Sequence, residues 1–215
     1  MALVELGRFP EALDAFGEAN QLARQNPTIG DKSAPYLEWM GTVLWIMGHQ
    51  AAGCELFRAA VDGVWYRTIA YTDGAGGVGP GLLLWFAGVS HHDENAISRS
   101  LEYLLRLSKR SRISQWPGPL ASVVLSQRDI EDVLYDHFST RELASAISMS
   151  SDDTHKSRKL AQLLFCWATK LRAEGDHRQS KALFAKCARL ERAVLEEERC
   201  LAAAEIRASK TTVAR

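Results

Sequence analysis

The stretch "MGHQAAGCELFRAA", residues 47–60, decides the fold because two other segments, 6–19 and 174–187, repeat its spacing without gaps. Each segment has a glycine, a small residue five positions later and Phe nine positions after the glycine. Glycine ends a helix in the left-handed cap conformation, the small residue lets the next helix cross closely, and Phe fills the gap between the two. The three segments therefore predict three helix–turn–helix corners. The glycines are Gly7, Gly48 and Gly175, the small residues are Ala12, Gly53 and Ser180, and the aromatic residues are Phe16, Phe57 and Phe184.

Helical periodicity extends outward from these corners. Leu37, Met40 and Leu44 precede the second corner at spacings of three and four residues, which is typical of an amphipathic helix. Strand patterning is confined to about Val64–Thr72. We therefore predict an all-α fold of stacked antiparallel helical hairpins.

The corners and the positions before them resemble the tetratricopeptide-repeat (TPR) family, whose unit is a helix–turn–helix of about 34 residues. Before Gly48, the residues Leu37, Met40, Gly41 and Leu44 stand where that family has large, large, small and large side chains. In the last copy the same places are taken by Leu164, Trp167, Ala168 and Leu171. The resemblance implies a TPR-like αα-superhelix.

The expected organisation is one TPR-like domain over residues 1–208, followed by a disordered tail at 209–215. Shorter helices are expected within 116–150, where Ser139 and Glu142 have capping-box spacing. The repeats are expected at about 1–27, 34–63, 79–110 and 160–195. The repeat at 79–110 is degenerate, because Ser100 stands where Phe is expected.

The resemblance also implies a binding site, because the first helix of each tetratricopeptide unit lines a concave groove. Carried over by position, the partner-binding residues are Glu38, Thr42, Trp45, Trp85, Phe165, Thr169 and Arg172. Trp and Arg are enriched in binding hot spots. The alternative, that the rings of Trp45 and Trp85 are buried between helices, stays equally open.

The stretch "DGAGGVGPG" at 73–81 contains G-x-G-x-x-G over Gly74–Gly79, between the strand-like segment and an apolar helix. Strand, glycine loop and helix cradle the pyrophosphate in dinucleotide-binding folds. Those folds also need an acidic residue on a second strand, whereas Asp93 and Glu94 lie in a turn between helices. A loop between repeats, with Pro80 in the first turn of the next helix, is the favoured interpretation. A nucleotide-binding enzyme that uses this loop stays as an alternative.

Other candidate chemistry is sparse. The run "HHDE" at 91–94 offers metal ligands, but adjacent helical residues do not face each other, so we expect a turn in which Asp93 caps the next helix. The four cysteines form no C-x-x-C pair and predict buried free thiols. No nucleophile motif occurs. We therefore predict no catalytic residue, no cofactor and no metal.

The charges balance over the whole chain, with 26 Lys plus Arg and 26 Asp plus Glu, which argues against a general grip on nucleic acid. A basic run at 106–112 and an acidic run at 129–136 are expected to be solvated helix faces. The alternative is that they steer a partner. No apolar run approaches the roughly 18 residues of a membrane span, and the expected location is cytoplasmic.

These observations predict a module that binds another protein or peptide in a helical-repeat groove. The order of glycine loop, basic stretch, "WPGPLA" and closing repeat is similar to two bacterial groups. The first is the helical immunity proteins, which implies a contact-dependent toxin as the partner. The second is the TPR lipoproteins, which implies an adaptor in the cell envelope. Because the chain shows no lipoprotein signal, the first group is favoured.

Overall fold

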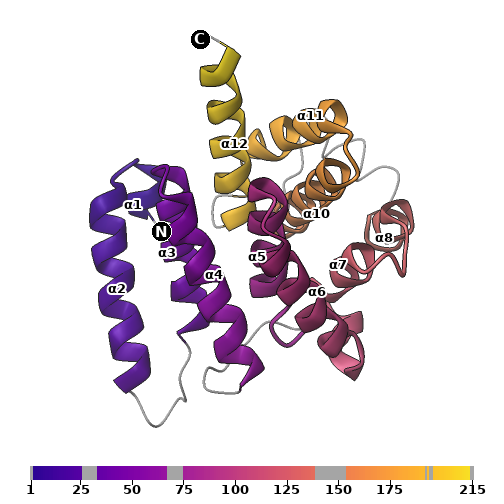
Figure 1. The fold of residues 1–215 in the computed structure, drawn as a ribbon, viewed down its shortest axis with the longest axis horizontal. Coiled ribbons are helices and arrows are strands. Elements are labelled where there is room, and N and C mark those ends of the chain that lie inside the picture. The colour runs from indigo at the N-terminus through magenta and orange to yellow at the C-terminus, as the bar shows by residue number, and fades with distance from the viewer. Residues whose placement is uncertain are drawn as a thin grey trace. The chain divides into compact units, whose positions relative to one another are not determined.

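The protein is described by a computed structural model, and the part of the 215-residue chain that it describes is folded into helices. The described residues are 2–25, 33–66, 75–138, 154–191, 193 and 196–213, with side chains as far as Ser209. Among them there is no strand, and the predicted all-α fold class is confirmed (Figure 1). None of the helices in these ranges is both long and apolar enough to cross a bilayer.

Contacts between helices divide the chain into an N-terminal unit, Met1–Gly118, and a C-terminal unit, Pro119–Arg215, where the sequence predicted one domain. The N-terminal unit contains α1 (Ala2–Glu5), α2 (Phe9–Gln25), α3 (Ala34–Ile46), α4 (Gln50–Trp65), α5 (Val78–His91), α6 (Glu94–Ser108) and the 3-10 helix η1 (Ser111–Ser114). Helix α7 (Gly118–Val124) begins at the boundary, and after it follow α8 (Ile130–His137), α10 (Thr154–Ala173), α11 (His177–Ala188) and α12 (Glu197–Val213).

The hairpin α3–α4 forms at the stretch from which the fold was predicted. Gly48 ends α3 in the left-handed conformation, with φ of 89°. A Cβ atom on Gly53 would lie 2.7 Å from the carbonyl oxygen of Gly41, so only glycine allows this close crossing of the two helices. The ring of Phe57 is fully buried beside them. The predicted corner is therefore confirmed in each of its parts.

The other two predicted corners have the same geometry. Gly7 and Gly175 are left-handed, with φ of 71° and 88°, and Phe16 and Phe184 are buried. The hairpin α5–α6, at the degenerate repeat, turns differently. His92 takes the left-handed conformation there, with φ of 56°, although it is not glycine.

The strand predicted over Val64–Thr72 is wrong where the structure can be described, because α4 continues through Trp65. Residues 67–74, including Gly74 of the glycine loop, lie outside the described residues. Gly77 is left-handed at the N-cap of α5, and its carbonyl accepts a hydrogen bond from the Tyr103 hydroxyl. Pro80 lies in the first turn of α5, as the sequence predicted.

In the C-terminal unit, α12 packs against both helices of the hairpin α10–α11. Helix α12 continues to Val213, so Ser209 lies in a helix where the sequence predicted a disordered tail. The helices α7 and α8 lie within the predicted range 116–150. The predicted capping pair Ser139 and Glu142 falls outside the described residues. The superhelical stacking of the repeats stays a prediction.

Candidate functional site

The structure places most of the predicted partner-binding residues in the interior. The buried members of the set are Glu38, Thr42, Trp45, Trp85, Phe165 and Thr169. The indole of Trp45 is 2% exposed, and its ring centroid lies 4.9 Å from that of Phe86 and 5.0 Å from that of His91. These exposures fit the alternative in which the tryptophan rings are packed between helices.

Arg172 is the member of the predicted set that stays half-buried, on α10. Its guanidinium carbon lies 4.7 Å from the centroid of the Phe184 ring. Its Nη1 atom forms an ion pair with Oε2 of Glu205, on α12, at 2.8 Å. Arg172 therefore joins α10 to two other helices of the C-terminal unit.

The candidate ligands for metals take structural roles. Asp93 caps α6 as predicted, because its Oδ1 accepts hydrogen bonds from the backbone N–H groups of Asn95 and Ala96. All four cysteines are free and buried, as predicted. Burial raises the pKa of the Cys166 thiol to about 12, so it is protonated and unreactive. Within the described ranges, the group that could hold a metal is a run of three acidic residues, Glu196–Glu198.

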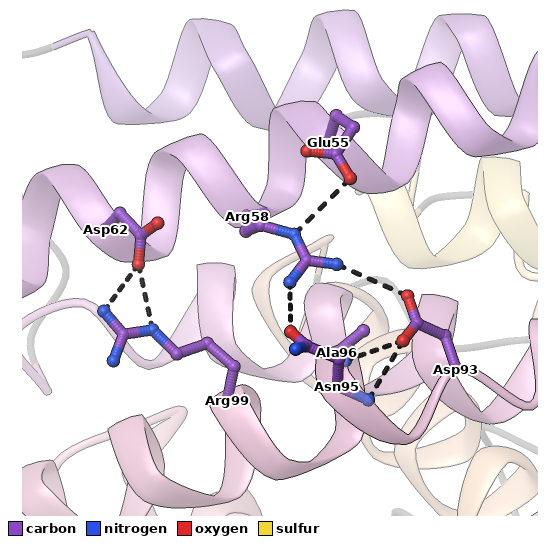
Figure 2. Close-up of polar contacts among 7 residues, drawn as sticks. All are labelled: Glu55, Arg58, Asp62, Asp93, Asn95, Ala96 and Arg99. Atoms are coloured by element: carbon purple, nitrogen blue, oxygen red, sulfur yellow. Dashed lines mark hydrogen bonds and ion pairs between the residues drawn. The ribbon is translucent and has the colours of Figure 1, made fainter.

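The site with the most organised chemistry lies between α4 and α6, where polar contacts cross from one helix to the other (Figure 2). Arg58 of α4 donates to Asn95 at 2.7 Å and pairs with Asp93 at 3.3 Å, both at the start of α6. One turn along both helices, Arg99 of α6 donates through Nε and Nη2 to Oδ1 of Asp62, at 2.9 and 2.7 Å. The two helices are thereby fixed side by side.

The contact with Asp62 also stabilises the charged form of the Arg99 side chain. Burial disfavours that charge, but the hydrogen bonds and the negative charge of Asp62 outweigh it and raise the pKa of Arg99. The side chain is only 20% exposed. Its guanidinium carbon lies 4.4 Å from the ring centroid of Trp65 and 5.8 Å from that of Tyr66, which is cation–π geometry.

A second arginine stacks on the same indole. The guanidinium carbon of Arg106, two turns after Arg99 on α6, lies 4.7 Å from the ring centroid of Trp65. Beside this stack, the side chain of Tyr66 is 66% exposed. We call Trp65, Tyr66, Arg99 and Arg106 the cation–aromatic surface.

The cation–aromatic surface continues into the basic run that the sequence singled out. Arg106, Lys109, Arg110 and Arg112 are exposed, and none of them forms an ion pair with another described residue. A Cβ atom on Gly76 would lie 3.9 Å from Nη1 of Arg110, so this arginine lies beside the described part of the glycine loop. This end of α6 therefore carries a local excess of positive charge, although the net charge of the whole chain is zero.

Sequence reasoning found the basic run but missed its aromatic partner. Trp65 and Tyr66 belong to the segment that was predicted as a strand. A helical interpretation of Asp62, Trp65 and Tyr66 would have placed them at the exposed end of α4, and Arg99 and Arg106 share a face of α6 because they are seven residues apart.

Comparison of the chain with models of protein families, with curated proteins and with solved structures finds no match. The resemblance to the tetratricopeptide family therefore stays a prediction from the sequence.

Proposed function

We propose that the protein binds an acidic segment of another protein through the cation–aromatic surface of the N-terminal unit. The observation that carries the proposal is Arg106, which stacks on Trp65 but has no ion-pair partner among the described residues. Tyr66 lies exposed beside it. Trp, Tyr and Arg are the residue types enriched at the centres of protein interfaces.

The surface is held in place before any partner arrives. Asp62 fixes Arg99, and Arg99 and Arg106 together fix the indole of Trp65. Side chains that are already ordered lose less conformational entropy on binding, which favours affinity. The positive charges of Lys109 and Arg110, which pair with no other described residue, would steer an acidic segment toward this end of α6 and suppress basic partners.

This surface differs from the groove that the family resemblance implied. The predicted groove residues belong to α3, α5 and α10, the first helices of their hairpins, and nearly all of them are buried. The cation–aromatic surface belongs to α4 and α6, which are second helices. Protein binding is therefore proposed as the function with a different set of residues. Toxin neutralisation and an adaptor role in the cell envelope stay predictions, because no described contact favours either one.

The test is affinity capture with the full chain, followed by calorimetry with the purified captured protein. We expect Tyr66→Ala and Arg106→Glu each to lower the affinity about 30-fold, which corresponds to a hot spot of about 2 kcal/mol. Arg24→Glu makes the same charge change at an exposed position near the end of α2 and should retain the affinity of the original chain.

Two outcomes would contradict the proposal. One is equal loss of affinity with Arg24→Glu, which would mean that only net charge matters. The other is capture that disappears after nuclease treatment, which would mean that the surface binds nucleic acid, since exposed aromatic and basic side chains also suit single strands.

A further inference from the structure

A cleft of about 180 Å³ opens in the C-terminal unit between α10, α11 and α12. Arg172 lines it from α10, and Ser180, Lys181 and Phe184 line it from α11. Glu205 and Ile206 close it from α12. The cleft therefore combines charged, hydroxyl and apolar side chains in one small space.

Ser180 contributes a buried hydroxyl to the cleft, and no hydrogen bond of this hydroxyl is found within the described residues. Its side chain is 1% exposed. A serine inside a helix often donates to the carbonyl four residues earlier. Here the carbonyl of Asp176 accepts the backbone N–H of Ser180 and no bond from Oγ. Because buried hydroxyls are almost always hydrogen-bonded, this orphaned hydroxyl points to an acceptor that a ligand would bring.

The charges of the cleft favour a negative ligand. Arg172 and Glu205 form an ion pair at 2.8 Å and largely cancel each other. Lys181, together with His177 at the rim, forms no ion pair with a described residue. The remaining charge is therefore positive, while Phe184 and Ile206 supply apolar contact.

The first hairpin shows that the corner itself does not require these polar residues. In the gap-free alignment of α3–α4 with α10–α11, Trp45 corresponds to Arg172, Gly53 to Ser180 and Cys54 to Lys181. All three residues of the first hairpin are buried. The polar lining is thus particular to the second hairpin, although both hairpins turn through the same corner.

From these observations we infer that the cleft binds a carboxylate carried on a short apolar arm. The Ser180 hydroxyl donates to one carboxylate oxygen, Lys181 supplies the opposite charge, and Ile206 contacts the arm. The inference does not depend on the cation–aromatic surface, because every residue that it uses lies in the C-terminal unit.

The experiment is a titration of the isotopically labelled full chain with sodium propionate, followed through the amide resonances of α11. Sodium chloride at equal ionic strength gives the reference. We expect saturable shifts around Ser180 with propionate only. Ser180→Ala and Lys181→Gln should each weaken the apparent affinity at least fivefold, whereas Lys186→Gln, at an exposed position of the same helix, should leave it unchanged.

A second titration distinguishes the source of the carboxylate. N-acetylglutamate α-amide carries a single carboxylate on its side chain, as an acidic residue of a bound protein would. Tighter binding of this compound than of propionate assigns the site to a protein side chain, and the reverse order assigns it to a small organic acid. Shifts equal to those with chloride, or unchanged affinity in Ser180→Ala, would overturn the inference.

Discussion

The hairpins α3–α4 and α10–α11 turn through the same left-handed glycine and bury the same phenylalanine, but they surround that ring with different chemistry. In the first hairpin the Trp45 ring lies 6.4 Å from Phe57. In the second, the corresponding residue is Arg172, whose guanidinium lies 4.7 Å from the Phe184 ring.

The helix that packs on each hairpin shows the same difference between aromatic and charged contacts. Helix α5 brings Phe86 to Trp45, at a centroid distance of 4.9 Å, whereas α12 brings Glu205 to Arg172. The glycine, the small residue and the Phe are therefore sufficient for the corner. The positions around them are free to build either a closed core or a polar cleft.

Trp45→Ala and Arg172→Ala should differ strongly in the stability that each variant loses. Trp45→Ala should destabilise the protein by about 3–5 kcal/mol, because a large buried ring leaves a cavity. Arg172→Ala should cost about 1–2 kcal/mol, because it removes the ion pair between Arg172 and the largely buried Glu205. Urea unfolding followed by circular dichroism measures both.

Leu22→Ala is the control for this pair, since Leu22 is an exposed apolar residue and should change stability by at most about 0.5 kcal/mol. A loss below about 1 kcal/mol for Trp45→Ala would mean that the ring is not part of the core. The two hairpins would then not differ in the way that their contacts indicate.

The next effect concerns the close crossing of α3 and α4. Gly53→Ala should cost about 1–3 kcal/mol, because the new Cβ would meet the Gly41 carbonyl oxygen at 2.7 Å and push the helices apart. Gly17→Ala is the matched control. A Cβ on Gly17, inside α2, meets no atom within 4 Å, so this change should stabilise the protein by about 0.5–1 kcal/mol. Thermal melting of both variants is sufficient, and a gain for Gly53→Ala would show that the crossing is looser than described.

The corners could be predicted from the sequence because each rests on a local requirement. Gly48 and Gly175 have positive φ, which other residues rarely adopt, and Phe57 and Phe184 follow at a fixed helical spacing. The repetition of this spacing three times outweighed the irregular composition of the segments between the corners.

The candidate sites could not be predicted in the same way, because each depends on contacts between distant elements. Trp65 acquires its role from Arg99 and Arg106, more than thirty residues later. The β-branched and aromatic composition around it favoured a strand, but packing of α4 against α6 overrides that preference. In the sequence, Ser180 is likewise only a small residue at a helix crossing. Its place in a cleft depends on α12, which forms the third wall.

A smaller effect on stability is expected at the start of α12. Carboxylates are buried there, whereas the start of α5, the helix that packs on the first hairpin, buries apolar residues. Burial raises the pKa of Glu198 well above its usual value and also raises the pKa of Glu196, which pairs with Arg158. A raised carboxyl pKa means that the folded protein binds protons more tightly than the unfolded chain. The contribution of Glu198 to stability is therefore lost as the pH rises from about 4.5 through its folded-state value.

Glu198→Gln removes that ionisation, so we expect it to raise the melting temperature at pH 7.5 and to give a smaller gain as the pH falls toward 4.5. The control is Glu191→Gln, at an exposed position, which should shift stability by at most about 0.5 kcal/mol at either pH. A gain that grows toward low pH would contradict the direction of the pKa shift.

The smallest expected effect on stability is that of Ser180→Ala, the counterpart of Gly53→Ala in the second hairpin. The crossing positions of α10–α11 already carry side chains at Ala168 and Ser180, so the alanine Cβ fits where the serine Cβ lies. The substitution removes a buried hydroxyl that has no partner, and alanine is the better helix former. We therefore expect stability to stay the same or to rise by up to about 1 kcal/mol, measured by urea unfolding without added carboxylate. A loss of more than about 1 kcal/mol would mean that Oγ is hydrogen-bonded within the protein. The hydroxyl would then not be available to a ligand, and the second hairpin would be as closed as the first.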